Sequence, residues 1–165
     1  PPQCFRRQRQ MCIRDRVGFG SVGIGSTQPT AMLDVDGHTK FKTYSEAVTS
    51  PSISSNEVTL DLSAAQSFTI TASDDINAFV LTNPPSGSTS FTVKILQDST
   101  GSRSVGIDTF KNSSGTAIPV YWPGGVLPIV TPTADRSDIY SFKTFDGDDI
   151  TSAGLYGVVG GQNFA

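Results

Sequence analysis

Hydrophobic and polar residues alternate one by one through most of the chain after residue 56. In the first such run, Val58, Leu60 and Leu62 alternate with Thr59 and Asp61. Strict alternation places every second side chain on the same face of a β-strand, so it predicts strands with one buried face. Similar runs predict further strands at residues 68–71, 76–81, 91–96, 105–107, 127–130, 139–145 and 155–159.

Turn-forming residues separate these predicted strands. The clearest turns are residues 83–87 (NPPSG) and 98–102 (DSTGS), where proline, glycine and small polar residues cluster. No segment shows the sustained periodicity of a helix. Strands at intervals of about 8–12 residues with turns between them are typical of a sandwich or a jelly roll. We therefore predict an all-β fold with an antiparallel β-sandwich or jelly-roll head at residues 57–165.

The predicted core of this head consists of the large apolar residues on the alternating faces. These are Leu60, Leu62, Phe68, Ile70, Val80, Phe91, Val93, Ile95, Ile139, Phe142 and Tyr156. Strict alternation cannot place Ile139 and Phe142 on the same face, because they lie three residues apart. We therefore expect a β-bulge, or a strand buried on both faces, at this point.

Residues 17–37 differ from the head in their glycine spacing. Glycines recur at positions 18, 20, 23 and 25, which disfavours a helix. Leu33 and Val35 then alternate with Asp34 and Asp36 before Gly37, which predicts a short strand ending in a turn. So small a unit cannot bury its apolar side alone, and copies of itself are the simplest cover. We predict an extended fibre-type neck here, followed by a polar connector at residues 38–56.

The first sixteen residues have a different composition from the rest of the chain. They hold both cysteines and five arginines, whereas the remainder is acidic and rich in Ser and Thr. A basic arm for nucleic acid or a membrane surface is one interpretation. However, residues 6–15 (RRQRQMCIRD) resemble a translated transposon-type sequencing adapter. We therefore expect residues 1–16 to be an appended, disordered segment, and the natural protein to extend further toward its N-terminus.

Composition narrows the function classes. Hydrophobic residues make up 36% of the chain and charged residues 16%, both low for a globular enzyme. The single histidine, His38, leaves little material for histidine catalysis or zinc binding, although three copies around an axis could bind an ion. No apolar run approaches the ~18 residues of a membrane span, and the acidic body argues against a nucleic-acid partner. We expect no catalytic residue, no cofactor and no metal site.

Aromatic residues are the main candidates for ligand contact. Tyr121, Trp122 and Tyr140 could form a platform for a receptor or a glycan. The alternative is that such residues close the end of the β core. Loops at residues 99–103, 111–116 and 146–152 are further candidate contact surfaces.

Residues 22–37 (VGIGSTQPTAMLDVDG) resemble a repeat of phage tail fibres and related trimeric fibrous proteins, whose usual form is GIGTxxPxxxLDVxG. The positions that carry this resemblance are Gly23, Gly25, Pro29, Leu33, Asp34, Val35 and Gly37. The remainder, notably residues 60–66, 105–110, 121–125 and 155–162, is similar to the C-terminal domains of virion structural proteins from marine contractile-tailed phages. The resemblance implies a homotrimer on the virion, an extracellular particle, with other virion proteins as partners and a host-surface glycan or protein within reach.

Three hypotheses follow. The first is a structural, tail-fibre-like virion protein that forms a homotrimer. The second is a carbohydrate-binding β-sandwich module of a secreted or cell-surface protein, which would carry an exposed aromatic platform on a monomer. The third is a fibre-borne depolymerase, which would need two facing carboxylates in a cleft.

Overall fold

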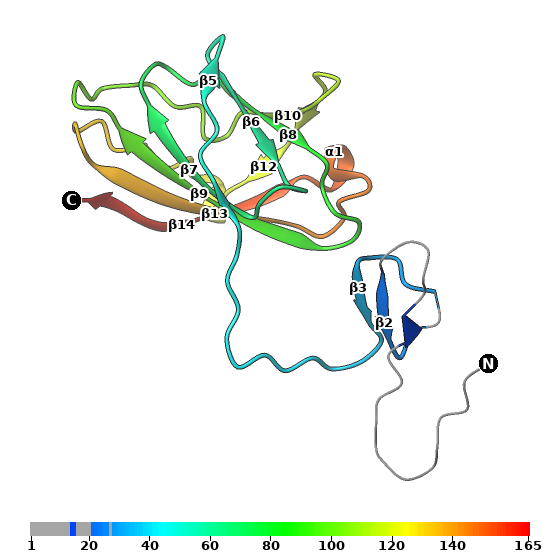
Figure 1. The fold of residues 1–165 in the computed structure, drawn as a ribbon. Helices are drawn as coiled ribbons and strands as arrows, with labels where there is room; N and C mark the ends of the chain where they lie inside the picture. The colour runs from blue at the N-terminus through cyan, green and yellow to red at the C-terminus, as the bar shows by residue number, and fades with distance from the viewer. Residues whose placement is uncertain (1–13, 16–20, 27) are drawn as a thin grey trace, which may run out of the picture. The chain divides into compact units, whose positions relative to one another are not determined.

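The chain divides into two units, residues 1–44 and residues 45–165. The computed structural model in Figure 1 describes residues 14–15, 21–26 and 28–165. Within these ranges strands predominate, and the helical elements are a four-residue helix α1 (Ile150–Ala153) and a 3-10 turn η1 (Pro123–Gly125). The all-β prediction is confirmed.

The smaller unit extends beyond the predicted neck of residues 17–37 into the leader and the connector, and it contains a three-stranded sheet; from here on we call this unit the neck. The strand order of this sheet is β1 (Arg14–Asp15), β2 (Val22–Ile24) and β3 (Leu33–Val35). Strand β2 runs antiparallel to β1 and parallel to β3. The strand expected after residue 32 is therefore present as β3. The expectation that the whole leader is disordered is wrong for β1, and the rest of the leader and glycines 18 and 20 lie outside the described residues.

The larger unit, the head, contains two sheets. One has five strands in the order β11 (Ala117–Ile118), β10 (Phe110–Asn112), β8 (Ala78–Thr82), β6 (Glu57–Asp61) and β5 (Ile53–Ser54). The other has six strands in the order β12 (Val120–Tyr121), β14 (Leu155–Phe164), β13 (Ser137–Thr144), β9 (Thr89–Gln97), β7 (Ser67–Ala72) and β4 (Val48–Thr49). Figure 1 shows these strands as two facing layers.

The two sheets are mixed, which corrects the prediction of an antiparallel head. From β6 to β10 the chain crosses to the opposite sheet after every strand. A strand that returns after one excursion runs in its earlier direction, so β6, β8 and β10 are parallel neighbours. Strands β7 and β9 are parallel for the same reason. Strand β4 is also parallel to β7, although the β5–β6 hairpin of the other sheet lies between them in the chain, and β13 pairs antiparallel with both β9 and β14. Hydrophobic alternation fixes the buried face of a strand but does not identify its neighbour.

The core lies between the two sheets and is rich in aromatic rings. Phe110 of the five-stranded sheet lies 4.9 Å from Phe142 and 6.3 Å from Phe91 of the six-stranded sheet, centroid to centroid. Phe79 stacks on Phe110 at 5.1 Å. Each buried large side chain of this kind contributes about 1.5–3 kcal/mol relative to its exposed form. The two layers are therefore joined chiefly by apolar burial.

Most of the predicted core residues are buried, with three exceptions. Val80 and Ile139 are half-buried and Tyr156 is exposed, because all three point to the outer faces of their sheets. In β13 the inward positions include Tyr140 and Phe142, so Ile139 faces outward. The pairing of β13 with β14 shifts register on both sides of Ile139, which agrees with the expected irregularity. The remaining eight predicted core residues are buried: Leu60, Leu62, Phe68, Ile70, Phe91, Val93, Ile95 and Phe142.

Two of the predicted strands are not strands. Residues 127–130 join neither sheet, and Pro128 at this point has no N–H to donate to a ladder. Residues 105–107 form a turn, with a hydrogen bond from the Ile107 N–H to the Val105 carbonyl (2.9 Å) and one isolated bridge from Val105 to Ile76.

The boundary of the head also differs from the expected one. The head unit begins at Ser45, and strands β4 and β5 come from the segment expected to be a connector. Both strands are two residues long and lie at sheet edges, which explains why alternation does not reveal them.

Candidate functional site

The structure separates the three aromatic residues predicted as a contact platform. Tyr140 is fully buried, and its hydroxyl donates to the Asp138 carboxylate at 3.0 Å, so its proposed role in surface contact is wrong. Trp122 is half-buried and packs edge-on against Tyr140 and Phe142, at 6.2 and 5.7 Å between ring centroids. These two residues close the end of the core. Tyr121 is exposed to 47% on the outer face of the six-stranded sheet.

Tyr121 belongs instead to a row of three exposed aromatic rings, which we call the aromatic row: Tyr121, Tyr156 and Phe145. Tyr121 of β12 is the register partner of Tyr156 in β14, and their ring centroids lie 5.2 Å apart. Phe145 follows β13 directly, and its ring meets Tyr156 edge-on at 5.5 Å. The rings therefore gather on one surface because neighbouring strands place them side by side.

A cation and a set of hydroxyl groups adjoin the aromatic row. Lys143 of β13 is opposite Tyr156 in register, and its ammonium lies 5.4 Å from the centroid of Phe145. On the far side of Lys143, the register partner is Ser90 of β9. In the next row across the same face, the hydroxyls of Ser141 and Thr92 are hydrogen-bonded at 3.1 Å. The face thus offers ring faces, an ammonium group and hydroxyls together.

Glycines make room for this arrangement. A Cβ at Gly154 would lie 2.7 Å from the Tyr121 ring, and Gly154 has φ = 72°, a conformation that favours glycine. On the inner face, a Cβ at Gly157 would lie 2.7 Å from the indole of Trp122. The segment of residues 154–157 therefore fixes Tyr121 on one side of the sheet and Trp122 on the other.

The neck holds the residues of the fibre-type motif in a closed loop. The Asp34 carboxylate accepts hydrogen bonds from the Thr30 N–H (2.9 Å), the Thr30 hydroxyl (3.3 Å) and the Ser26 hydroxyl (3.3 Å). The pKa of Asp34 is lowered, chiefly by the bond from the Thr30 N–H. A Cβ at Gly23 would lie 2.5 Å from the Ser26 carbonyl oxygen and 2.9 Å from Pro29. The motif residues Gly23, Pro29 and Asp34 are thus brought together.

The apolar side chains of the neck are poorly covered by the neck itself. Leu33 and Met32 are 52% and 72% exposed, and Val35 is half-buried. Gly25 adopts φ = 79°, and Gly37 and His38 are exposed. Among the described residues of this unit, Gly23 alone is buried. The described part of the neck therefore has a defined backbone but no apolar core.

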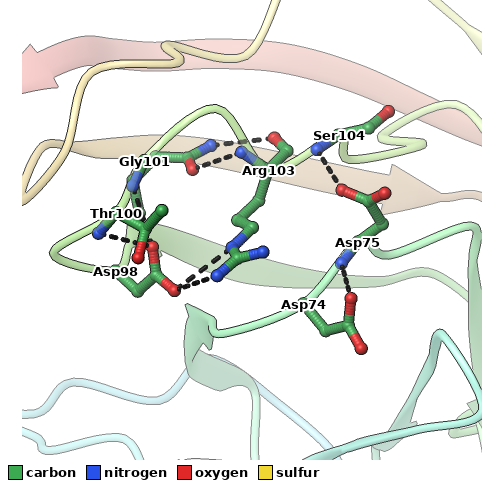
Figure 2. Close-up of polar contacts among 8 residues, drawn as sticks. Asp74, Asp75, Asp98, Thr100, Gly101, Arg103 and Ser104 are labelled. Atoms are coloured by element: carbon green, nitrogen blue, oxygen red, sulfur yellow. Dashed lines mark hydrogen bonds and ion pairs between the residues drawn. The ribbon is translucent and has the colours of Figure 1, made fainter.

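The candidate contact loop at residues 99–103 is held by a polar network, shown in Figure 2. The Asp98 carboxylate accepts from the N–H groups of Thr100 and Gly101, at 3.0 and 2.8 Å, and from the Arg103 guanidinium at 2.8 and 3.1 Å. The Asp75 carboxylate accepts from the Ser104 N–H at 2.8 Å, and the Asp74 carboxylate accepts from the Asp75 N–H at 2.8 Å. The bond from Arg103 is the largest cause of the lowered pKa of Asp98. These carboxylates shape the loop.

The other two candidate loops are also ordered by their own polar side chains. In the loop at residues 111–116, the Asn112 side chain accepts from the Thr116 N–H at 2.9 Å. Lys111 pairs with Glu57 at 2.5 Å. In the loop at residues 146–152, Asp149 caps α1, and the Asp146 carboxylate accepts from the Asp148 N–H at 3.0 Å.

Hydrogen bonds from neighbouring backbone and side-chain groups hold many of the described carboxylates. The pKa is lowered for each aspartate whose pKa shift is clear: Asp34, Asp61, Asp98, Asp138 and Asp149. A general acid needs a raised pKa instead. The hollow beside β5 and β6 is lined by one carboxylate, Glu57, which is paired with Lys111. A second hollow, in the neck, is lined by two carboxylates, Asp34 and Asp36. Among the described residues, no group of three or more His, Cys, Asp or Glu side chains is placed to hold a metal ion.

Comparison with family models, with curated proteins and with solved structures finds no match for the chain. In the part of the chain that the structure describes, no helix is long and apolar enough to span a membrane.

The aromatic row was only partly predictable. Alternation predicts Tyr156 as a core residue, because it lies within an apolar run, and it predicts Phe145 as the last residue of a strand. Tyr156 lies between Leu155 and Gly157, so it must face outward once Leu155 faces the core. The sequence alone does not show whether the odd-numbered or the even-numbered residues of this strand face the core.

Proposed function

We propose that the chain is a structural module of a virion, the tail-fibre-like part of a contractile-tailed phage particle, that acts as a homotrimer and not as an enzyme. The proposal places it on the extracellular particle, in contact with other virion proteins and facing the host surface. The match of residues 22–37 to the fibre repeat supports this assignment. The trimeric state in this proposal is taken from that resemblance.

The observation that carries the proposal is the uncovered apolar surface of the neck. The side chains of Met32 and Leu33 are exposed to water. Burial of each side chain would contribute about 1.5–3 kcal/mol. In the same segment, closely packed glycines and the hydrogen bonds to Asp34 hold the backbone in a fixed shape. A fixed shape with an uncovered apolar side is the property of a surface that is completed by a partner. Identical chains around an axis would cover it in each copy at once.

Sedimentation velocity of the full chain and two variants tests this role. The double variant Met32→Ser and Leu33→Ser removes the apolar contact and leaves the glycines and Asp34 in place. The matched control is Val48→Ser, which changes an exposed apolar residue on the edge strand of the head. We expect the wild-type chain and the control to sediment as trimers and the double variant as a monomer. A monomeric wild-type chain at micromolar concentration would contradict the proposal.

The aromatic row favours a second candidate function, a carbohydrate-binding module of a secreted or cell-surface protein. Tyr121 and Tyr156 offer adjacent half-exposed rings with polar ends, a combination common in binding surfaces. The two candidates differ in oligomeric state, because this module would bind as a monomer. They agree that the head contacts a surface outside the cell.

A further inference from the structure

We infer that the aromatic row and the adjoining outer face of the six-stranded sheet form a binding site for a neutral saccharide. This inference deepens the surface-contact part of the proposed function and rests on it for the source of the saccharide. The residues assigned to the site are Tyr121, Tyr156, Phe145, Lys143, Ser90 and Ser141.

The rings supply the apolar half of the site. Tyr121 and Tyr156 are each 47% exposed and Phe145 is 63% exposed, yet the three lie within 5.2 and 5.5 Å of their neighbours in the row. Contacts between these rings fix their positions before any ligand arrives. The face of an aromatic ring carries partial negative charge, and the C–H groups on the face of a sugar ring carry partial positive charge. A sugar ring can therefore stack on this row.

The groups beside the rings supply the polar half. Register places Lys143 between Tyr156 and Ser90 across three adjacent strands, so these side chains recur at the strand spacing of about 4.8 Å. Sugar hydroxyls both donate and accept hydrogen bonds. This face presents an ammonium group, which only donates, together with Ser and Thr hydroxyls, which can donate and accept. Lys143 forms no salt bridge with any residue of the described part of the chain. Its donors are thus available to a ligand.

This mixture distinguishes a saccharide from a protein partner. The centre of a protein interface is depleted in lysine and serine. Here Lys143 and Ser90 continue the line of the rings directly, and the neighbouring line contains the hydrogen-bonded Ser141 and Thr92. Aromatic ring faces and hydrogen-bonding groups lie close together on this surface. A saccharide fits such a surface, because each sugar ring presents both an apolar C–H face and hydroxyl groups.

The charge around the site favours a neutral sugar over an acidic one. The loop that follows Phe145 contains three aspartates, Asp146, Asp148 and Asp149, and Lys143 is the single positive residue of residues 137–152. A sulfated or carboxylated sugar on the row would be attracted by the Lys143 ammonium and repelled by the carboxylates of this acidic loop, whereas Lys94, a second lysine of this face, lies two rows away opposite Ile139. A neutral sugar avoids this repulsion and still accepts a hydrogen bond from Lys143.

Binding of the full chain to an array of neutral and acidic glycans, followed by calorimetry with the soluble neutral oligosaccharides that bind, tests the inference. We expect binding to neutral glycans. Tyr156→Ala and Tyr121→Ala should each weaken it by about tenfold or more. Tyr156→Phe should retain most of the affinity, because the ring remains. Phe164→Ala is the matched control, since Phe164 is a similarly exposed aromatic residue of the same strand outside the row.

Several results would overturn the inference. These are the absence of any neutral glycan ligand, selective binding of acidic glycans, or unchanged affinity in a Tyr156→Ala variant that melts like the wild type. A shift of Tyr156→Ala to a lower oligomeric state would instead show that a second copy covers the row. The outcome is separable from that of the fibre proposal. A trimer without a neutral glycan ligand contradicts the saccharide site alone, and a glycan-binding monomer contradicts the fibre alone.

Discussion

Asp138 provides the sharpest test of how the head holds its C-terminal strand. This residue of β13 is 1% exposed, and its carboxylate accepts four hydrogen bonds. Two come from the backbone N–H groups of Thr131 (2.7 Å) and Asn163 (2.8 Å). The other two come from the Tyr140 hydroxyl (3.0 Å) and the Gln162 amide (3.2 Å). The carboxylate therefore ties the end of β14 and the loop before β13 to the core.

Replacing Asp138 by alanine removes an acceptor from four donors, of which the Gln162 amide keeps the Ile129 carbonyl and the Tyr140 hydroxyl as partners. Each buried donor that loses its partner costs about 1–3 kcal/mol, but the four costs share one cavity and do not add in full. We expect Asp138→Ala to lower the free energy of unfolding by about 3–5 kcal/mol, comparable to breaking a buried charged pair. Asp138→Asn keeps one acceptor oxygen and should cost about 1–3 kcal/mol. In urea unfolding, the alanine variant should move the midpoint by roughly 2 M.

The pH dependence of the same variants gives an independent check. Burial raises the pKa of Asp138, but the hydrogen bonds from Thr131 and Asn163 lower it by more, so the net pKa lies below its ordinary value. A group with a lowered pKa in the folded state stabilises the fold above its unfolded pKa. That contribution is lost as pH falls through the folded value. The stability gap between wild type and Asp138→Asn should therefore be full above about pH 4 and should shrink in stronger acid.

The control for this experiment is Asp108→Ala, because Asp108 is exposed and its carboxylate accepts a 3.3 Å bond from the hydroxyl of its neighbour Thr109. Its unfolding midpoint should stay close to that of the wild type. A loss of less than about 0.5 kcal/mol in Asp138→Ala would refute the assigned role, since surface substitutions commonly have effects of that size.

Three further predictions concern packing. Gly157→Ala places a Cβ 2.7 Å from Trp122. We expect the free energy of unfolding to fall by about 1–3 kcal/mol and the tryptophan emission maximum to shift. An unchanged emission spectrum and unfolding midpoint would argue against the contact. Phe110→Ala opens a cavity between the sheets and should cost about 3–5 kcal/mol in chemical denaturation, and a loss below 1 kcal/mol would contradict its central position. Gly25→Ala strains a residue at φ = 79° and brings a Cβ to 2.9 Å from the Asp36 carbonyl oxygen, so amide exchange in the neck should accelerate while the head remains protected.

The sequence predicted the local structure where a short pattern of neighbouring residues determines it. Alternation identified β6, β7, β9 and β13, because a strand with one buried face must repeat every two residues. The motif at residues 22–37 identified Gly23 and Pro29, which meet in the neck. Tyr140 could not be assigned correctly, because burial of a tyrosine depends on a partner for its hydroxyl, and that partner, Asp138, is polar.

Long-range pairing was beyond the reach of sequence patterns. The parallel pairing of β7 with β9 depends on the path of β8 through the other sheet, and no local residue encodes that path. Strand β12 is two residues long, yet it places Tyr121 beside Tyr156 and so creates the aromatic row. The candidate binding surface is therefore a product of topology.

Completion of the neck by identical chains is the central feature of the proposed function. Native mass spectrometry of the full wild-type chain, over a dilution series from micromolar to nanomolar, measures this directly. We predict a species of three times the 17.5 kDa chain mass that persists well below micromolar concentration. A single-chain mass throughout the series would contradict it.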